Sequence, residues 1–255
     1  MGVQYGVTLD TIADVVGAKR TLGCVIELGG AMFVPGIVER DTPPSRAWFA
    51  VGACDHRTVG REQELMNILR HSGTVEVYPD IRAAKWMKLV VHAAEVAPSA
   101  ILNLSLSEAI ETPGVRSLMT EVGCEALSVV QKAPLALVPI FGLPNLDPAC
   151  GRRFIEALLD SVAYHFAQPG SKTAVLQDWI KGRRSEVDDV NGAIVRKGAE
   201  ISHPTPFNSQ VLEIALRVEH GELTPGIANL DRLLQASLLD GSQDRRHGSL
   251  ARADR

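Results

Sequence analysis

The sequence has few cysteines and few aromatic residues, and it has no long apolar run. Its 255 residues include four cysteines, which lie far apart and form no Cys-x-x-Cys pair: Cys24, Cys54, Cys124 and Cys150. No histidine is spaced to complete a zinc site with them, so the sequence predicts no metal centre. Isolated cysteines are typical of reduced, mostly buried thiols, and we therefore expect a cytoplasmic protein.

Charge and hydropathy exclude further classes. The net charge of -4 gives no electrostatic reason to expect nucleic acid or an anionic membrane as a partner. No apolar run approaches the roughly 18 residues that a membrane span needs. The first six residues lack the basic and apolar regions of a signal peptide. A composition that is 45% hydrophobic and 22% charged is ordinary for a globular protein with a substantial core.

The first part of the chain mixes helical and strand-like patterns. A helix is predicted over residues 8–16, closed by Gly17, and another over residues 60–70. Strand-like runs occupy residues 22–28, 31–34, 48–51 and 74–78. Gly29-Gly30 separates the first two runs, which predicts a β-hairpin between them.

From Asp80 onward, apolar residues recur at helical spacing. Asp80 is predicted to cap a helix that runs to Ala97. Thr112-Pro113 and Asp147-Pro148 each combine a capping residue with a proline suited to a first helical turn. Further helices are predicted over residues 171–181, 185–198, 208–219 and 225–239. Residues 241–255 are charged and lack an apolar face, which predicts a disordered tail.

Two of these helices carry polar residues on one face. On the first, Lys88 and His92 share a face, with Glu95 close by. The pattern alone is more typical of a solvated lysine, because lysines are almost always exposed. On the helix at 185–198, Ser185 is predicted to cap the helix in an approximate capping box, with Glu186 beside it. Acidic residues at a helix N-terminus also stabilise its dipole, so this pattern alone does not require chemistry.

Three ordered motifs resemble those of ketopantoate reductases (2-dehydropantoate 2-reductases). They are Lys85-Trp-Met-Lys-Leu-Val-Val-His92, the Leu176-Gln-Asp to Asn191-Gly192 segment, and His203-Pro-Thr-Pro-Phe-Asn208. Gln4-Tyr-Gly6, followed by the helix, Gly17 and the hairpin, also resembles the family's segment that leaves the nucleotide-binding sheet. The resemblance therefore covers nearly the whole length, to about Leu239. It implies an α+β fold in which residues 1–79 are the remnant of a Rossmann-type dinucleotide-binding domain. Residues 80–240 would be the helical substrate and dimerisation domain, which is similar to that of 6-phosphogluconate dehydrogenases, followed by the tail at 241–255.

The resemblance also implies an activity and a set of site residues. Ketopantoate reductases use NADPH to reduce a branched 2-oxo acid, 2-dehydropantoate, to pantoate in pantothenate biosynthesis. Lys88 matches the proton donor, and Glu186 matches the glutamate that fixes the substrate hydroxyl. His92, Thr173 and Ala174 fall at or beside substrate-binding positions. For efficient proton donation, burial would have to lower the pKa of Lys88 toward the working pH.

Several positions depart from the family's pattern. Tyr5 stands in place of an asparagine close to the cofactor and substrate, and His92 replaces another. Val96, or Ala97 if the alignment slips by one residue, occupies a third position where an asparagine is usual. Ala174 corresponds to the serine that contacts the substrate carboxylate. Of the family's usual polar set, only the lysine and the glutamate are retained, which puts a pocket specific for ketopantoate in doubt.

The sequence contains no Gly-x-Gly-x-x-Gly, the glycine turn between a strand and a helix that holds a pyrophosphate. We therefore expect this chain alone to bind NADPH poorly and to be inactive. The sequence is compatible with a truncated protein, a split enzyme whose partner chain brings the cofactor, or a relic without reductase activity. A homodimer or that partner chain would cover the open sheet edge expected in residues 1–79.

Two other functions stay open. The chain could be a non-catalytic helical binding or dimerisation module, in which Lys88→Ala would leave partner binding intact. It could also be the helical substrate domain of a hydroxyisobutyrate-type or phosphogluconate-type dehydrogenase. Those families carry a lysine helix, but they lack the second and third motifs.

Overall fold

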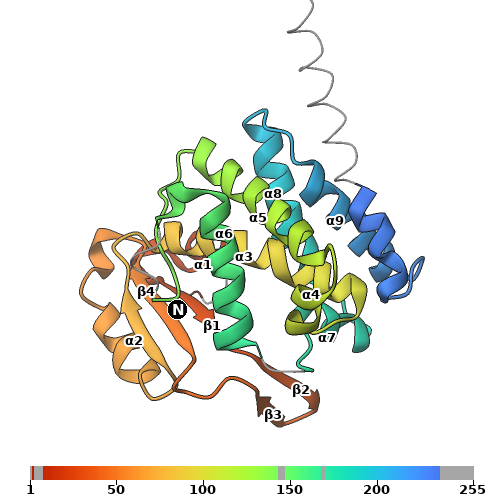
Figure 1. Ribbon diagram of the computed structural model, residues 1–255. Helices are drawn as coiled ribbons and strands as arrows, with labels where there is room; N and C mark the ends of the chain where they lie inside the picture. The colour runs from red at the N-terminus through yellow and green to blue at the C-terminus, as the bar shows by residue number, and fades with distance from the viewer. Residues whose placement is uncertain (1, 3–7, 143–146, 168–169, 236–255) are drawn as a thin grey trace, which may run out of the picture.

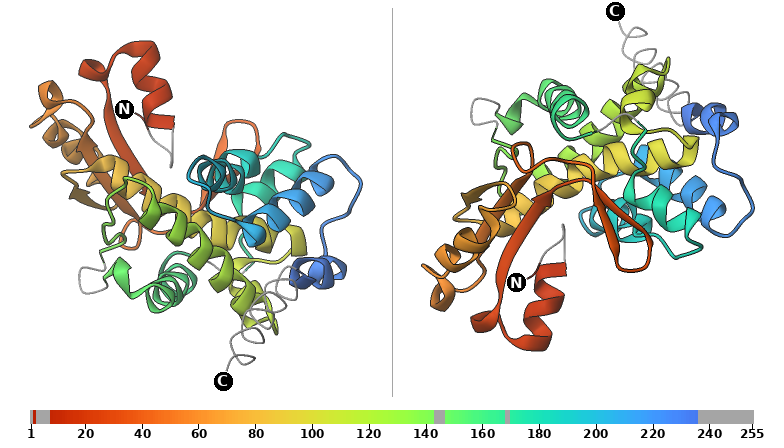
Figure 2. Two further views of the ribbon diagram at one scale, coloured as in Figure 1. Left: turned by 90° about the horizontal axis from the view of Figure 1, so that it is seen from above. Right: turned by 90° about the horizontal axis from the view of Figure 1, so that it is seen from below.

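The computed structural model describes residues 2, 8–142, 147–167 and 170–235. A small sheet with its helices lies on one side of the molecule, and a larger group of helices lies on the other (Figure 1). One long helix, α3 (Ile81–Leu102), runs from the sheet into the helical part, as both views in Figure 2 show. The predicted α+β fold class is confirmed. The predicted tail at 241–255 and the end of the predicted helix at 225–239 lie outside the described residues.

The main sheet has three strands in the order β1-β4-β5. Strand β1 (Leu22–Glu27) is antiparallel to β4 (Trp48–Ala53), and β4 is parallel to β5 (Thr74–Val77). Gly2 forms an isolated parallel bridge with Gly23 of β1.

Two helices cover the two faces of this sheet. Alternate residues of a strand point to opposite faces, so Val25 and Ala50 pack with α3 while Cys24 and Val51 pack with α2 (Glu62–Leu69). The first helix, α1 (Thr8–Val16), contributes Leu9 to the α3 side. Strand alternation therefore decides which β1 side chains reach α3.

The hairpin predicted at Gly29-Gly30 is wrong. Strand β2 (Gly30–Val34) pairs with β3 (Ile37–Arg40) in a separate two-stranded sheet. Pro35-Gly36 forms the turn between them, and Gly36 has a φ of 83°. Proline followed by glycine suits the central positions of a type II turn, which requires a positive φ at the second of them. This turn signal prevailed, and the two preceding glycines instead lead the chain from one sheet to the other.

The remaining helices follow the predicted order with some changes at their ends. They are α4 (Leu106–Glu111), α5 (Val115–Lys132), α6 (Arg152–Ser161), α7 (Ala174–Ile180), α8 (Val187–Glu200) and α9 (Pro206–Glu219). Single turns of 3-10 helix lie at Ala18–Arg20, His56–Thr58, Pro148–Cys150 and Ile227–Asn229, and a π-helical turn at Val162–Phe166 extends α6.

Two predicted helix starts are wrong. Thr112 ends α4 as its C-cap, and α5 begins after Gly114. Ser185 does not cap α8, because its backbone N–H and its hydroxyl both donate to Glu219 at 2.6 Å. Glu186 takes the N-cap position, without a side-chain capping bond. Each predicted cap residue has another hydrogen-bonding partner. The Thr112 side chain donates to the carbonyl of Glu108 in the preceding helix, and Ser185 donates to the distant Glu219.

The long helix begins as predicted but continues beyond Ala97. The Asp80 side chain accepts a hydrogen bond from the backbone N–H of Ala83 at 3.0 Å, as expected for an N-cap. The helix then passes through Pro98, which cannot donate a backbone hydrogen bond. Side chains hydrogen bond to two other carbonyls in the turn before it: the carbonyl of Ala93 accepts from Asn191 at 3.0 Å, and that of Glu95 accepts from Ser99 at 2.6 Å.

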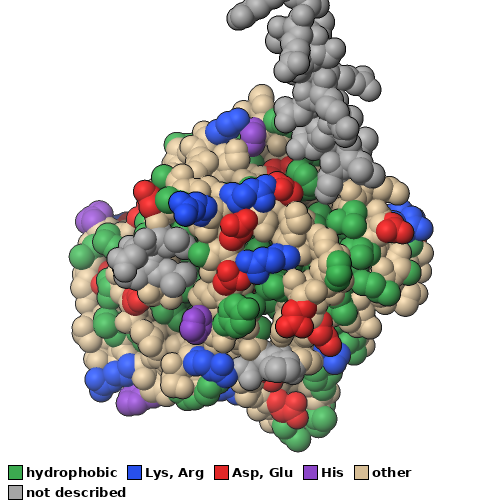
Figure 3. All heavy atoms as spheres, in the orientation of Figure 1, with side chains coloured by type: hydrophobic (Ala, Val, Ile, Leu, Met, Phe, Trp, Pro, Cys, Tyr) green, Lys and Arg blue, Asp and Glu red, His purple; other side chains and the backbone are tan. Residues whose placement is uncertain are grey.

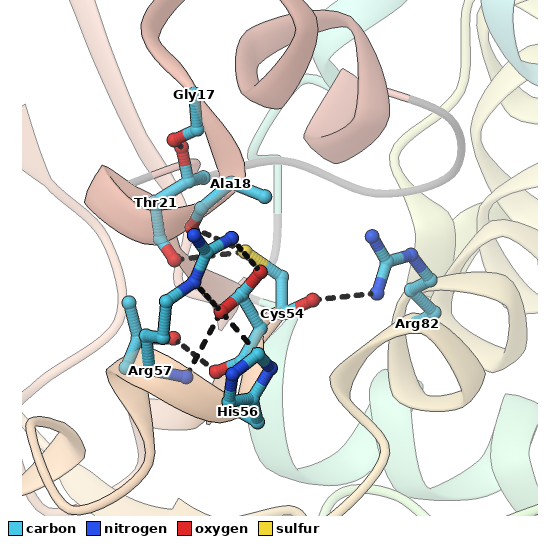
Figure 4. Close-up of polar contacts among 9 residues, drawn as sticks. Gly17, Ala18, Thr21, Cys54, His56, Arg57 and Arg82 are labelled. Atoms are coloured by element: carbon cyan, nitrogen blue, oxygen red, sulfur yellow. Dashed lines mark hydrogen bonds and ion pairs between the residues drawn. The ribbon is translucent and has the colours of Figure 1, made fainter.

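A polar network closes the end of the sheet where β4 finishes (Figure 4). The Cys54 thiol donates to the carbonyl of Thr21 at 2.8 Å, and the Cys54 carbonyl accepts from Arg82 at 3.2 Å. Burial raises the pKa of Cys54, which keeps this thiol protonated as a donor. Leu22 pairs with Ala53, so the network lies at the opposite end of β1 from its last residue.

The four cysteines are all free, but they are less buried than expected. Cys24 is buried, Cys54 and Cys124 are half-buried, and Cys150 is exposed. The residues with described positions contain no cluster of three His, Cys, Asp or Glu side chains that could hold a metal ion. Across the same residues, no helix is both long enough and apolar enough to cross a membrane. Acidic and basic side chains are interspersed on the face shown in Figure 3.

The two asparagines of the recognised motifs meet in the helical core. The Asn208 side chain donates to Glu125 at 2.7 Å and to the carbonyl of Val122 at 3.1 Å, and it accepts from Asn191 at 3.1 Å. Glu125 also accepts the backbone N–H groups of Phe207 and Asn208 at the start of α9. This network joins α3, α5, α8 and α9, so these motif residues hold helices together.

We predict that Asn208→Ala lowers the free energy of unfolding by about 2–4 kcal/mol. The substitution removes hydrogen-bonding partners from a buried carboxylate and a buried amide, which is costly when neither can reach water. Urea unfolding followed by circular dichroism measures the change. The matched control is Asn67→Ala on the exposed side of α2, which should shift stability by less than about 0.5 kcal/mol. Equal unfolding midpoints for the two variants would contradict the role given to the network.

Candidate active site

A cavity of about 300 Å³ lies between β1, α3 and the N-terminal ends of α7 and α8. This volume is at the lower end of what small-molecule sites usually offer. Five of the six predicted site residues line it: Lys88, His92, Thr173, Ala174 and Glu186. Segments nearly a hundred residues apart thus converge on one space. Tyr5, the sixth predicted site residue, lies outside the described residues.

Lys88 is buried against a carboxylate. Its side chain is 2% exposed, and its ammonium forms an ion pair with Glu27. The same ammonium lies 5.1 Å from the centre of the Phe141 ring, within the range of a cation–π contact. The interpretation of Lys88 as a solvated surface lysine is therefore wrong.

Burial lowers the pKa of Lys88 to about 8, although the charges of Glu95 and Glu186 act in the opposite direction. Removing an ammonium from water disfavours its charged form, and nearby carboxylates favour it. The balance leaves Lys88 mostly protonated at neutral pH, yet closer to losing its proton than an exposed lysine. A group with this pKa is suited to donating a proton to a reacting oxygen.

Glu27 is a site residue that the sequence analysis missed. It ends β1 and shares a strand face with Val25, which packs against α3. Its side chain therefore points toward the helix that carries Lys88. A carboxylate at a core-facing strand position was the available signal, but the resemblance assigned no role to Glu27.

The other ionisable side chains on this face of α3 are also perturbed. Burial, with a contribution from Lys88, lowers the pKa of His92 well below 6.5, so the imidazole is neutral near pH 7. Burial raises the pKa of Glu95 to about 7, and the charge of Lys88 opposes this rise. Among the described residues, nothing donates a hydrogen bond to Oε2 of Glu95, which is buried at the cavity wall.

The cavity is completed from the helical side. Glu186 lies at the N-cap position of α8, and its charge reaches Lys88. Thr173 precedes α7, and its hydroxyl donates to the carbonyl of Val96 at 3.3 Å. Ala174 presents only a methyl group at the position where a serine was expected by resemblance.

Aromatic side chains close the space behind Lys88. The Phe141 ring lies edge-on to Trp48, with 5.4 Å between ring centres, and 5.3 Å from Phe166. Phe141 has a φ of 61°, an uncommon conformation for a bulky residue. Such strain persists only where the surrounding packing fixes it. The aromatic side chains therefore form a packed wall beside the buried ion pair.

The described residues do not fit the phosphate end of a dinucleotide. Gly29 and Gly30 line the cavity, but they connect two strands and do not precede a helix. The N–H of Gly29 already donates to Thr42 at 2.8 Å, and the carbonyl of Gly30 accepts from Gln177 at 3.3 Å. In the described parts of the chain, these glycines offer no cradle for a pyrophosphate.

Known proteins are similar to this chain in sequence and in fold. A 2-dehydropantoate 2-reductase from Archaeoglobus fulgidus is 29% identical over 172 residues, which are 67% of this chain and 52% of the relative. A ketopantoate reductase from Ralstonia eutropha has a similar structure, with a TM-score of 0.65 and 24% identity over 86% of this chain and 66% of the other. A D-mandelate dehydrogenase in complex with NADH has a TM-score of 0.69 and 18% identity over 86% of this chain and 70% of the other.

The chain spans about half the length of the curated relatives it matches. Residues 80–219 match the family model described as the C-terminal part of ketopantoate reductase PanE/ApbA. This match covers more than half of the chain and includes Lys88, His92 and Glu186. The chain therefore belongs to the ketopantoate reductase family.

Proposed function

We propose that this chain supplies the substrate-binding and proton-donating part of an oxidoreductase that reduces a small, branched 2-oxo acid. The observation that carries the proposal is the buried Lys88, whose ammonium shares one cavity with Glu186. In this proposal, residues 80–240 are the helical substrate domain and residues 1–79 are the end of a dinucleotide-binding domain. By family resemblance, the substrate is 2-dehydropantoate and the pathway is pantothenate biosynthesis.

The chemistry assigned to this chain is the handling of one proton. Reduction of a ketone places negative charge on its oxygen, and the Lys88 ammonium donates a proton to it. The Glu186 carboxylate accepts a hydrogen bond from the substrate hydroxyl, and His92, as a neutral imidazole, adds a polar contact without adding charge. NADPH is the reductant by resemblance. A segment outside this sequence, or a partner chain, would bring the site for its phosphates.

A second function, a subunit that docks with a partner chain, is favoured by the β2–β3 hairpin. Its apolar side chains are exposed: Met32, Phe33, Val34, Ile37 and Val38. Exposed apolar groups this close together are typical of interaction surfaces. A homodimer or a chain that carries the nucleotide-binding half would each be compatible with this surface. The two functions can coexist in a split reductase.

We predict that this chain binds ketopantoate and that Glu186→Gln weakens the binding about tenfold. The reason is that the amide accepts a weaker hydrogen bond than the carboxylate does. Saturation-transfer NMR detects the binding, and a titration gives the ratio of dissociation constants. The control is Glu200→Gln, which removes an exposed carboxylate from the other end of the same helix. Lack of saturation transfer to ketopantoate in the wild type would refute the substrate assignment.

We predict that NADPH does not bind this chain alone with micromolar affinity, because the described residues offer no pyrophosphate cradle. A fluorescence titration of NADPH, repeated by calorimetry, measures this. A micromolar dissociation constant for the isolated chain would show that a phosphate site exists where the structure assigns none.

We predict that affinity for the anionic 2-oxo acid falls as the pH rises from about 7 to about 8. Glu95 gains negative charge near the lower pH and then repels an anion. Lys88 loses positive charge near the upper pH and then attracts an anion less strongly. In the Glu95→Gln variant, the affinity should fall only near pH 8, where Lys88 loses its charge. Calorimetric titrations at closely spaced pH values measure it. An affinity that rises over this interval would contradict the assignment of charges.

A further inference from the structure

The cavity contains more negative charge than the reduction of a 2-oxo acid requires. Three glutamates surround one buried lysine: Glu27 from β1, Glu95 from α3 and Glu186 from the N-cap of α8. The remaining groups that face the ammonium are the neutral imidazole of His92 and the ring of Phe141. Asp41 and Lys172 line the cavity as well, with charges of opposite sign. A substrate carboxylate therefore enters a space in which the main cation is already balanced.

Glu27 is in direct contact with Lys88. Its carboxylate forms an ion pair with the ammonium. Its residue is 9% exposed, so the pair is largely removed from water. In such surroundings the attraction between opposite charges is stronger than at the surface. Glu27 therefore fixes both the position and the charge balance of Lys88.

The strand register makes this contact difficult to rearrange. Glu27 pairs with Trp48 across the β1–β4 ladder, and Trp48 packs edge-on against Phe141. The ammonium thus contacts both a carboxylate from β1 and a ring that packs against β4. A side chain held by two such groups is positioned before any ligand arrives.

We propose that Glu27 is the residue that positions Lys88 and decides which end of a 2-oxo acid meets it. Because Glu27 already neutralises the ammonium, a second carboxylate gains little electrostatic free energy by binding next to Lys88. A ketone oxygen can still accept a hydrogen bond from one of the remaining N–H groups of Lys88. Glu27 thus directs the ketone oxygen toward Lys88 and the ligand carboxylate away from it. This role rests on the proposed function, since it concerns the orientation of the same substrate class.

The test compares two ligands of similar shape, 3-methyl-2-oxobutanoate and 3-methylbutanoate, which differ in the ketone. Wild type should bind the oxo acid more tightly. In Glu27→Gln the ammonium is free to pair with a carboxylate, so binding of the simple acid should tighten about tenfold and the preference should shrink. Glu27→Asp keeps the charge and should restore most of the preference. Glu39→Gln, an exposed glutamate on β3, is the matched control and should bind like wild type.

A second measurement reports on Lys88 directly. In ¹³C-labelled protein, the lysine Cε signal that disappears in Lys88→Met gives the pKa of Lys88. Loss of the Glu27 charge should lower this pKa by about one unit, because an opposite charge in contact favours the ammonium. A folded Glu27→Gln protein with the wild-type pKa and the wild-type preference would overturn the proposal. If the Glu27→Gln variant does not fold, the test is made on the wild-type protein. The Glu27 Cδ signal is then expected to shift over the pH range in which Lys88 titrates. A Glu27 signal that does not shift would also overturn the proposal.

The two measurements separate this inference from the proposed function. A wild-type chain that binds neither acid, but whose Lys88 pKa falls in Glu27→Gln, would refute the function and retain Glu27 as the positioning residue. A chain that binds the oxo acid, with no response of Lys88 to Glu27→Gln, would retain the function and refute the role of Glu27.

Discussion

The site depends on one buried ion pair, in which the Lys88 ammonium from α3 lies beside the Glu27 carboxylate from β1. Taking two charges out of water is expensive, and their attraction repays the loss only with good geometry and additional hydrogen bonds. An apolar pair of similar size often stabilises a protein as well or better. The Lys88–Glu27 pair is therefore better explained by chemistry than by stability. The sheet, the aromatic residues around Phe141 and the helices packed on α3 supply the stability that allows it.

Much of the architecture follows from hydrophobic period and capping, and the exceptions have local causes. The helix at 8–16 was predictable from its apolar spacing, and the helix that begins after Asp80 was predictable because apolar spacing and the cap residue agree there. The hairpin at Gly29-Gly30 was not, because the competing Pro35-Gly36 turn decides which strands pair. The sequence around Ser185 is typical of a helix N-cap, but in the structure Ser185 donates its hydrogen bonds to Glu219, thirty-four residues later. Contacts between distant segments override local preference in these cases.

The motifs that carried the family resemblance divide into two physical classes. Lys88 and Glu186 face the cavity. Asn191 instead donates to Asn208 inside the helical core, and Asn208 donates to Glu125. Short motifs therefore preserve the packing of helices as much as the reacting groups. Glu27 shows the converse: it contacts Lys88 but was not singled out from the sequence, because its position depends on strand pairing rather than on local sequence.

The continuity of α3 through Pro98 has a consequence for the electrostatics of the site. Lys88, His92 and Glu95 sit on one unbroken helix, so their spacing is set by helical rise and does not depend on a flexible loop. Asn191 of α8 and Thr173 before α7 donate hydrogen bonds to carbonyls of α3 close to that proline. The dipoles and charges around a ligand are consequently fixed in advance. Little free energy then has to be spent on reorienting the protein when charge develops on a bound oxygen.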